Sequence, residues 1–268
     1  MTERNVSKGE RRQAIYQYLK EHGSISLQQL TEQFQCSEAT ARRDLEALEE
    51  NGGIIRTLGG GAKYVAKAAM YEVPFREKEQ LLLEEKEAIA DVAVSFVKEG
   101  DVIGLTGGTT TYLIAKALKR KKHVTIVTNA VNIAMELADM DDLQVVLTGG
   151  MLRNKNYELS GPLAERTLEV LNIHTLFMGV DGVSAEQGIS THSEFDASIA
   201  KLMMSRSERT IAVFDHSKWL RSSLFHIAPL SALHGCISNA VPPADTLSML
   251  QQIGLQVHIA EKQGASFK

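Results

Sequence analysis

The chain has 268 residues, of which 44% are hydrophobic and 23% charged, a composition typical of a globular protein with room for one small and one medium domain. No apolar run reaches the roughly 18 residues of a membrane span, and the polar start, MTERNVSKGERR, lacks the apolar core of a secretory signal. A net charge of −4 argues weakly against a nucleic-acid binder, and the two cysteines lack metal-ligand spacing. We therefore expect a cytoplasmic protein with reduced thiols, no metal and no cofactor.

A supporting helix, begun by an S-x-x-E capping box at Ser7 and ending near Gly23, is followed by a pair of short helices. Ser26 begins a capping box of the S-x-x-Q type, and apolar residues follow on one helical face at Leu27, Leu30 and Phe34. A short link then leads to Ser37, a good N-cap for a second helix. Two short capped helices joined by a few residues predict a helix-turn-helix.

The second of these helices has two different faces. Its apolar stripe is Ala41, Leu45 and Leu48, and its opposite face holds Ala39, Arg42, Arg43 and Glu46. Two adjacent arginines suit a helix lying in the DNA major groove, where one contacts a phosphate and the other a base edge. Taken alone, Arg42-Arg43-Asp44 is more simply a solvated helix face, but the capped helix before it favours DNA recognition.

A short hairpin is predicted to follow the recognition helix. Gly52 and Gly53 end the helix, residues 54–57 are β-prone, and residues 59–61 are glycines in a turn suited to positive φ. A helix-turn-helix with such a wing predicts double-stranded DNA as a partner. The predicted DNA-contacting residues are Ser37, Ala39, Thr40, Arg42, Arg43 and Arg56.

Charge in this region is balanced, since residues 1–63 hold 9 Lys and Arg and 9 Asp and Glu. The basic residues are nonetheless grouped at the start of the chain and on the predicted recognition helix and wing: Arg4, Lys8, Arg11, Arg12, Arg42, Arg43, Arg56 and Lys63. We expect a local basic surface, in a DNA binder that relies on specific paired contacts more than on bulk attraction.

From residue 85 onward, apolar strand candidates alternate with helical patterns. The candidate strands are 102–105, 124–127, 145–147, 176–180, 211–214, 236–237 and 257–259. This alternation predicts a mostly parallel sheet covered by helices on both faces. The predicted organisation is a winged helix-turn-helix over residues 1–65, a linker over 66–84 that merges into a helix, and an α/β domain over 85–268.

Small polar residues follow the ends of these strands, where open α/β sheets bind ligands. The strongest such segment is Thr106–Thr111, in which a Gly-Gly pair lets the backbone approach a ligand and the next helix offers free N–H groups to an anion. It is no Walker A loop, and an ordinary strand-to-helix turn is an equal alternative. Lys218 after Asp215, and the polar run from Thr191 to Asp196, are each more simply solvated when taken alone.

The N-terminal pattern resembles the DeoR-type bacterial transcriptional regulators. That family carries a motif close to S-x-x-T-x-R-R-D-L-x-x-L-E-x-x-G … R-x-x-G-G-A. The matching residues are Ser37, Thr40, Arg42, Arg43, Asp44, Leu45, Leu48, Glu49, Gly52 or Gly53, Arg56, Gly60, Gly61 and Ala62. Ala41 stands where the family usually has Ile, and the glycine before the wing is doubled. Neither departure removes a predicted DNA contact.

The second part of the chain is similar to the effector domain of the same family, whose fold is similar to ribose-5-phosphate isomerase and glucosamine-6-phosphate deaminase. The matching residues are Gly108-Thr109-Thr110, Thr128-Asn129, Gly149-Gly150, Gly161, Gly179, Asp181-Gly182, Asp215, Ser217 and Lys218. In the isomerase relatives the Gly-Thr loop and the lysine handle sugar phosphate. The family commonly has Asp where Thr106 stands. This variant, with Ser190-Thr191-His192 and residues 221–224, looks like the branch that represses N-acetylgalactosamine and galactosamine use.

The resemblance implies an α/β protein made of a winged helix-turn-helix and a mostly parallel effector domain, which acts as a repressor controlled by a phosphorylated sugar. The phosphate is expected on the N–H groups of Gly108 to Thr110, with Lys218 as countercharge, while Asn129, Asp181 and Glu194 orient sugar hydroxyls. The full set of predicted effector-binding residues is Thr106, Gly107, Gly108, Thr109, Thr110, Asn129, Gly149, Gly150, Asp181, Glu194 and Lys218.

Two other functions stay open at this point. One is a sugar-phosphate isomerase or deaminase that carries a DNA-binding domain; it needs a positioned general base, for which Asp181, Glu194 and Asp196 are candidates, although no spacing shows one poised. The other is a constitutive DNA binder with a purely structural second domain. We favour the non-enzymatic regulator. Because paired half-sites need two-fold symmetry, we also expect a homodimer or homotetramer held mainly by residues 85–260.

Overall fold

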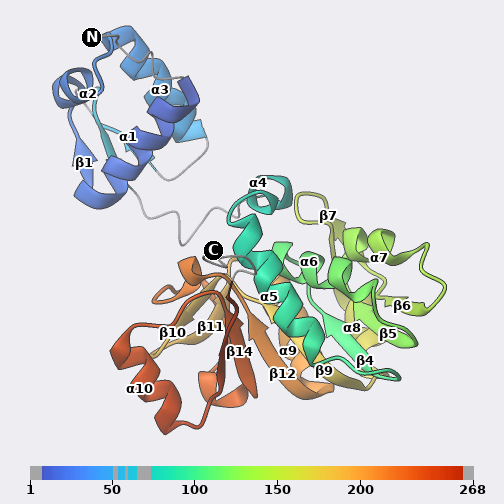
Figure 1. Ribbon diagram of the computed structural model, residues 1–268. Coiled ribbons are helices and arrows are strands. Elements are labelled where there is room, and N and C mark those ends of the chain that lie inside the picture. Colours follow the sequence, from blue (N-terminus) through green and yellow to red (C-terminus); the bar gives the residue numbers. More distant parts are fainter. Residues whose placement is uncertain (1–7, 51–53, 58–59, 65–73, 262–268) are drawn as a thin grey trace, which may run out of the picture. The chain divides into compact units, whose positions relative to one another are not determined.

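The computed structural model describes residues 8–50, 54–57, 60–64 and 74–261, and the chain divides into two compact units, Met1–Tyr71 and Glu72–Lys268 (Figure 1). Within the residues that the structure describes, no helix is long and apolar enough to cross a membrane. Each unit has its own hydrophobic core.

In its described residues the first unit has three helices and a three-stranded antiparallel sheet in the order β1-β3-β2. Its elements are α1 (Lys8–His22), β1 (Ser24–Ile25), α2 (Leu27–Gln33), α3 (Glu38–Glu50), β2 (Ile54–Arg56) and β3 (Ala62–Tyr64). Ser26 caps α2 with both hydrogen bonds of a capping box, and Ser37 Oγ accepts from the N–H of Thr40 at the start of α3. The predicted helix-turn-helix and wing are therefore present.

The turn of the wing depends on two glycines. Gly60 has φ +80°, as the sequence predicted for this turn. Gly61 lies so close to Ile25 that a Cβ on it would stand 2.4 Å from the Ile25 carbonyl oxygen. Gly59 lies outside the described residues. The wing is thus held against β1, which keeps it beside the recognition helix.

The second unit is built on a seven-stranded sheet in the order β15-β14-β12-β9-β4-β5-β6, and every pairing in it is parallel. Its strands are β4 (Val102–Leu105), β5 (Val124–Thr128), β6 (Leu143–Leu147), β9 (Ile173–Gly179), β12 (Ser207–Val213), β14 (Gly235–Ser238) and β15 (Val257–Ile259). All seven predicted strands are confirmed.

Helices cover both faces of this sheet (Figure 1). One face packs against α5 (Leu83–Ser95), α6 (Thr109–Leu118) and α7 (Val131–Leu137). The other packs against α8 (Pro162–Glu169), α9 (Glu194–Ser205) and α10 (Ala244–Gln252). Strand residues alternate between the two cores: Phe177 belongs to the first, and its neighbours Leu176 and Met178 belong to the second.

The strand order reverses direction between β4 and β9. The chain runs outward from β4 through β5 to β6 and then returns to place β9 on the other side of β4. In open α/β sheets the carboxyl ends of two such strands flank the crevice where ligands bind. The loops after Leu105 and Gly179 therefore lie at the expected ligand-binding position.

Two small β structures were not predicted from the sequence. A hairpin joins β7 (Met151–Arg153) to β8 (Glu158–Ser160), and a three-stranded sheet pairs β10 (Gly182–Ser184), β11 (Gly188–Thr191) and β13 (Phe225–Ala228). Strands of three or four residues are too short to show a clear alternation of apolar and polar residues, so their pattern carries little signal.

The predicted linker is partly helical. Residues 66–73 lie outside the described part of the chain, but Phe75–Glu79 form the short helix α4, and α5 already begins at Leu83. Both belong to the second unit. The boundaries at residues 65 and 85 stay a prediction.

Candidate DNA-contacting surface and effector site

The recognition helix α3 is oriented as its sequence predicted. Its apolar stripe is buried at Ala41, Leu45 and Leu48, and Ala39, Arg42, Arg43 and Glu46 are exposed on the other side. Thr40 is partly buried, and its hydroxyl lies 3.0 Å from the Oγ of Ser37, which caps the helix. The six predicted DNA-contacting residues therefore lie on α3, its cap and the adjacent wing, where a groove-binding helix would present them.

Two of the predicted DNA-contacting arginines make exposed ion pairs. Arg42 Nη2 lies 3.8 Å from Glu38 Oε2, and Arg56 Nη1 donates to Glu46 Oε1 at 2.9 Å. A Cβ on Gly60 would stand 3.1 Å from Arg42 Nη1, so the Arg42 guanidinium lies against the wing turn. Exposed pairs of this kind contribute only about 0–1 kcal/mol. An arginine can therefore leave such a carboxylate for a DNA phosphate at little cost in free energy.

The position of Asp44 argues against the alternative interpretation of α3. In that alternative Asp44 shared a solvated face with Arg42 and Arg43, but its side chain is only 1% exposed. Asp44 Oδ2 accepts from Arg11 Nε at 2.7 Å, and Asp44 Oδ1 accepts from Arg12 Nε at 2.8 Å. Arg11 and Arg12 had been counted in the basic surface, yet they hold α1 against α3. The available signal was the spacing of Asp44, three residues after the buried Ala41.

The effector site begins with a hydrogen bond between two strand ends. Thr106 follows β4 and is buried, and its Oγ1 accepts from the backbone N–H of Gly179 at the end of β9, at 3.0 Å. The same hydroxyl donates to the Gly107 carbonyl at 3.3 Å. Thr106 thus fixes the loop at the strand reversal, which leaves its hydroxyl less free for a ligand than the sequence interpretation assumed.

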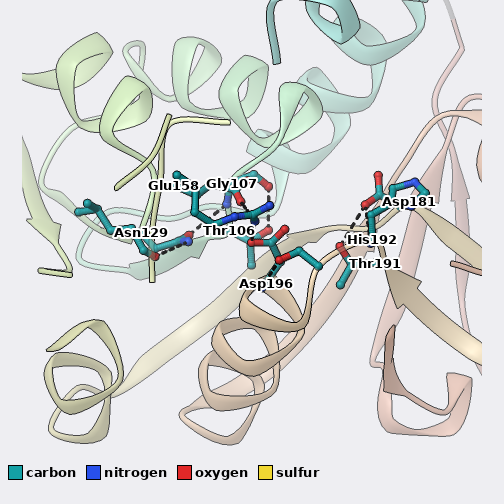
Figure 2. Close-up of polar contacts among 11 residues, drawn as sticks. Thr106, Gly107, Asn129, Glu158, Asp181, Thr191, His192 and Asp196 are labelled. Carbon is teal, nitrogen blue, oxygen red and sulfur yellow. Dashed lines mark hydrogen bonds and ion pairs between the residues drawn. The ribbon is translucent and has the colours of Figure 1, made fainter. Parts of the chain in front are cut away.

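Asn129, which follows β5, holds the same loop from the other side (Figure 2). Its Oδ1 accepts from the N–H of Gly107 at 3.1 Å, and its Nδ2 donates to the Leu159 carbonyl in β8 at 3.2 Å. The side-chain amide is therefore engaged at both ends. Asn129 was predicted to orient sugar hydroxyls, but in the structure it positions the Gly107 loop and the β7–β8 hairpin.

The start of α6 presents backbone N–H groups to this crevice. Gly108 is the N-cap at φ +133° and offers no side-chain cap, and the hydroxyl of Thr111 turns back to the Gly108 carbonyl at 3.0 Å. The first N–H groups of a helix have no partner within the helix, and its N-terminus carries a partial positive charge. The helix N-terminus predicted after β4 is therefore present at Gly108 to Thr110, and anion binding there stays a prediction.

Asp181, after β9, anchors a second group of polar residues (Figure 2). Asp181 Oδ2 accepts from Thr191 Oγ1 at 3.0 Å and from the N–H of His192 at 3.3 Å, and Lys218 Nζ lies 3.9 Å from Asp181 Oδ1. Burial would raise the pKa of Asp181, but the charges of Lys78 and Lys218 and the Thr191 hydrogen bond outweigh it and lower that pKa to about 2. Asp181 is therefore an anion held by cations, which makes it a poor proton acceptor.

A third group includes residues that the sequence interpretation missed. Arg153 on β7 forms ion pairs with Glu158 on β8 and with Asp196 on α9. Glu158 is buried against Gly107, where any side chain would overlap the Glu158 carboxyl group. Burial, and then the nearby Asp196, raise the pKa of Glu158 well above its ordinary value, although Lys78 and Arg153 oppose this. The hairpin thus places the Glu158 carboxyl group against the predicted anion-binding loop, and Arg153 links that group to α9.

The remaining predicted residues lie less centrally. Glu194 is exposed at the first residue of α9, whereas Asp196, two residues later, faces Arg153 and the site. Gly150 has φ +124°, and a Cβ on it would stand 2.5 Å from the Ser160 carbonyl oxygen. Gly149 is exposed beside it. The structure thus favours Asp196 over Glu194 and gives Gly150 a packing position against β8.

Two family models match the chain. A DeoR-like helix-turn-helix domain matches residues 11–67, and a DeoR C terminal sensor domain matches residues 82–240.

Several curated proteins are similar over nearly the whole chain. A putative aga operon transcriptional repressor from Escherichia coli O157:H7 is 34% identical over 248 residues, which cover 92% of each chain. The HTH-type transcriptional repressor GlcR from Bacillus subtilis is 32% identical over 253 residues, 94% of this chain and 96% of its own. The glycerol-3-phosphate regulon repressor from Escherichia coli K12 is 28% identical over 253 residues, 93% of this chain and 98% of its own.

Among solved structures, the ribose 5-phosphate isomerase A of Methanocaldococcus jannaschii aligns with 52% of this chain and 55% of its own, at a TM-score of 0.40 and 19% identity. That of Neisseria gonorrhoeae aligns with 51% of this chain and 53% of its own, at a TM-score of 0.38 and 24% identity.

Proposed function

Because this chain belongs to the DeoR family of transcriptional regulators, we propose that it represses a carbohydrate-utilisation operon and that a phosphorylated sugar controls its binding to DNA. Like the similar repressors, the chain is a DNA-binding regulator and not an enzyme. The repressor names of these relatives, among them an aga operon and a glycerol-3-phosphate regulon, support a sugar or polyol phosphate as the effector.

One observation carries the proposal for the effector. The uncapped start of α6 opens at the strand reversal of the parallel sheet, where Asp181, paired with Lys218, follows the end of β9. Helix N-termini at this position bind phosphate groups because their N–H groups and the helix dipole both favour an anion. We infer that phosphate binds Gly108 to Thr110 and that Lys218 supplies the countercharge.

The acids of the site support recognition of a sugar. Asp181 is ionised at neutral pH, and Asp196 and Glu158 lie in the neighbouring group of polar residues. Carboxylates accept hydrogen bonds from sugar hydroxyls, so a ligand with a phosphate at one end and hydroxyls at the other would complement this arrangement. Inorganic phosphate alone would satisfy only the α6 end.

Effector binding changes gene expression only if it favours one arrangement of the protein over another. We propose that the bound form has lower affinity for the operator. We further propose that the chain is a homodimer or homotetramer held mainly by residues 85–260, since a helix-turn-helix protein reads paired half-sites. Light scattering on a chain lacking residues 1–65 tests this; a monomer would contradict it.

A thermal-shift screen tests the effector. The panel contains inorganic phosphate, glycerol 3-phosphate, ribose 5-phosphate and N-acetylgalactosamine 6-phosphate. A ligand that binds only the folded state at about 100 times its Kd stabilises that state by about 2.7 kcal/mol, so Tm should rise with at least one phosphorylated sugar and not with its unphosphorylated form. No shift with any member of the panel would overturn the proposal.

A substitution locates the site. A charge-assisted contact contributes about 1.5–3 kcal/mol, so Lys218→Ala should weaken binding of the best panel ligand about 10- to 100-fold in calorimetry. Operator affinity without ligand should stay near wild type, which predicts a repressor that ignores its inducer. Lys201→Ala, on an exposed position of α9, is the matched control. Equal affinity of Lys218→Ala and wild type would show that the ligand binds elsewhere.

A further inference from the structure

Helix α4 is docked on the second unit by a single aromatic anchor. Phe75 is buried, and its ring makes edge contacts with Tyr112 on α6 and with Tyr157 in the β7–β8 hairpin, at centroid distances of 5.5 and 5.6 Å. The N–H of Phe75 donates to the Lys155 carbonyl at 3.0 Å. Arg76 Nε donates to the Tyr157 hydroxyl at 2.8 Å. The helix is thus tied to the hairpin that carries Glu158 and to the first turns of α6.

This docking places Lys78 beside the effector site. Tyr112, which contacts Phe75, lies about one helical turn after Thr109, so α4 lies next to the anion-binding end of α6. The backbone carbonyl of Lys78 accepts from the buried Lys86 Nζ at 2.7 Å, and Leu81 offers a second carbonyl to the same ammonium group at 2.5 Å. The backbone of α4 is therefore fixed while the Lys78 side chain stays partly exposed.

The Lys78 ammonium group acts on groups from several elements of the site. Its charge lowers the pKa of Asp181 after β9 and opposes the raised pKa of Glu158 on β8. Burial lowers the pKa of His192, and the Lys78 charge adds to that effect. It also contributes, after burial, to the pKa of about 8 at Lys86. Among the described residues, no hydrogen bond or ion pair joins the Lys78 side chain to another group. A cation that lies near the site without a partner is suited to receive an anionic ligand.

We propose that Lys78 is an effector-binding residue, whose ammonium group contacts the anionic group of the ligand at the N-terminus of α6. This inference rests on the proposed function, since it requires an anionic effector at that position. The anion would then be held from three elements: the N–H groups of α6, Lys218 after β12, and Lys78 on α4.

The position of α4 gives this contact a regulatory consequence. Within the described residues, α4 is the first element of the second unit, and the segment that leads to it comes from the DNA-binding unit. An effector that binds Lys78 favours the docked state of α4 over an undocked one. Ligands shift an equilibrium only through such a difference in affinity between two states.

The test compares full-length wild type with Lys78→Met and Lys78→Arg. Methionine keeps helix propensity close to that of lysine, and the Lys78 contact with Lys86 uses only the backbone, so the fold should be kept. Because the Lys78 charge also helps to stabilise ionised Asp181, Tm without ligand at neutral pH should fall in Lys78→Met and should fall less in Lys78→Arg. For each panel member that binds wild type, Lys78→Met should weaken binding in calorimetry about 10- to 100-fold. Lys78→Arg should restore part of the affinity. Lys98→Met, an exposed lysine before the amino end of β4, is the control and should bind within about twofold of wild type.

A second measurement reads α4 directly. Hydrogen exchange of residues 74–82 should slow when the ligand saturates wild type and should slow less when it saturates Lys78→Met. If wild type binds no phosphorylated panel member, the proposed function itself fails. If wild type binds but Lys78→Met binds equally well, or shows the same slowing at saturation, the role of Lys78 is wrong while the proposed function stands.

Discussion

The backbone N–H of Gly179 donates a 3.0 Å hydrogen bond to the side-chain oxygen of Thr106, and this bond ties the end of β9 to the end of β4. A Cβ on Gly179 would stand 3.3 Å from the Gly107 carbonyl oxygen, so the two strand ends approach closely. The bond lies at the reversal of strand order, directly before the N-terminus of α6. The geometry of the proposed anion site therefore depends on this hydroxyl.

Thr106→Val should destabilise the second unit. Valine has the shape of threonine but no acceptor, so the partly buried N–H of Gly179 loses its partner at a cost of about 1–3 kcal/mol. The protein has one tryptophan, Trp219, which is buried in the second unit, so urea unfolding followed by its fluorescence measures this unit. Thr106→Ser keeps the acceptor and should lose less. A valine variant as stable as wild type would show that the bond contributes nothing.

Asp44→Asn should destabilise the DNA-binding unit. It leaves Arg11 and Arg12 facing a neutral amide in a place where the Asp44 side chain is 1% exposed, and both arginines are themselves partly exposed. Breaking a fully buried ion pair costs more than breaking an exposed one, and these pairs are intermediate. We therefore expect the free energy of unfolding to fall by about 1–3 kcal/mol. Faster hydrogen exchange in α3 would report it.

The matched control for Asp44 is Glu46→Gln on the same helix. Its pair with Arg56 is exposed at 2.9 Å, so its loss should change stability by less than about 1 kcal/mol. If the two variants exchange at the same rate, the burial of Asp44 has no energetic consequence.

Arg42→Ala and Arg43→Ala should each weaken operator binding. An arginine that reads a base should cost about 1–3 kcal/mol and relax specificity at one position, whereas one that contacts a phosphate should weaken all sequences and reduce the salt slope by about one. Gel-shift titrations at several salt concentrations distinguish the two. Lys20→Ala, exposed in the last turn of α1, controls for the lost charge. Unchanged affinity in both arginine variants would contradict the assignment of α3 as the recognition helix.

Asp181→Asn should lower stability at neutral pH and less so in acid. Because its pKa is lowered from 3.8 to about 2, ionised Asp181 contributes about 2 kcal/mol above pH 4, and this contribution disappears as the pH falls through 2. The difference between wild type and variant, followed by Trp219 fluorescence in urea, should shrink to about half by pH 3. A difference independent of pH would show that the carboxylate is not stabilised by its cationic neighbours.

Glu158→Gln gives the opposite sign in the same assay. The pKa of Glu158 is raised above 4.5 in the folded protein, so this group ionises at a lower pH in the unfolded protein than in the folded one. The free energy of unfolding of the wild type therefore falls as the pH rises from 4.5 toward the folded-state pKa. The glutamine variant should therefore gain on wild type as the pH increases. If it instead loses stability with rising pH, the ion pair with Arg153 outweighs the burial of the acid.

Much of the architecture could be predicted from local sequence patterns. The capping box at Ser26, the cap at Ser37 and the stripe of Ala41, Leu45 and Leu48 each lie within a few residues of chain, so periodicity and capping are sufficient to predict them. The seven strands of the large sheet are apolar runs bounded by turn residues. The glycine and threonine residues after β4 predicted the helix N-terminus for the same local reason.

Contacts between distant segments were decided only by the tertiary structure. The order of the strands in the sheet could not be predicted from local patterns. Only the tertiary structure shows that β9 lies beside β4. Arg153 and Asp196 meet across 43 residues through a hairpin too short to show a pattern. Asp44 turned inward because two arginines on α1 compensate its charge, and a single helix cannot show that. Periodicity records which face of an element is apolar; the partner that a polar side chain meets depends on how the elements pack, which no local pattern contains.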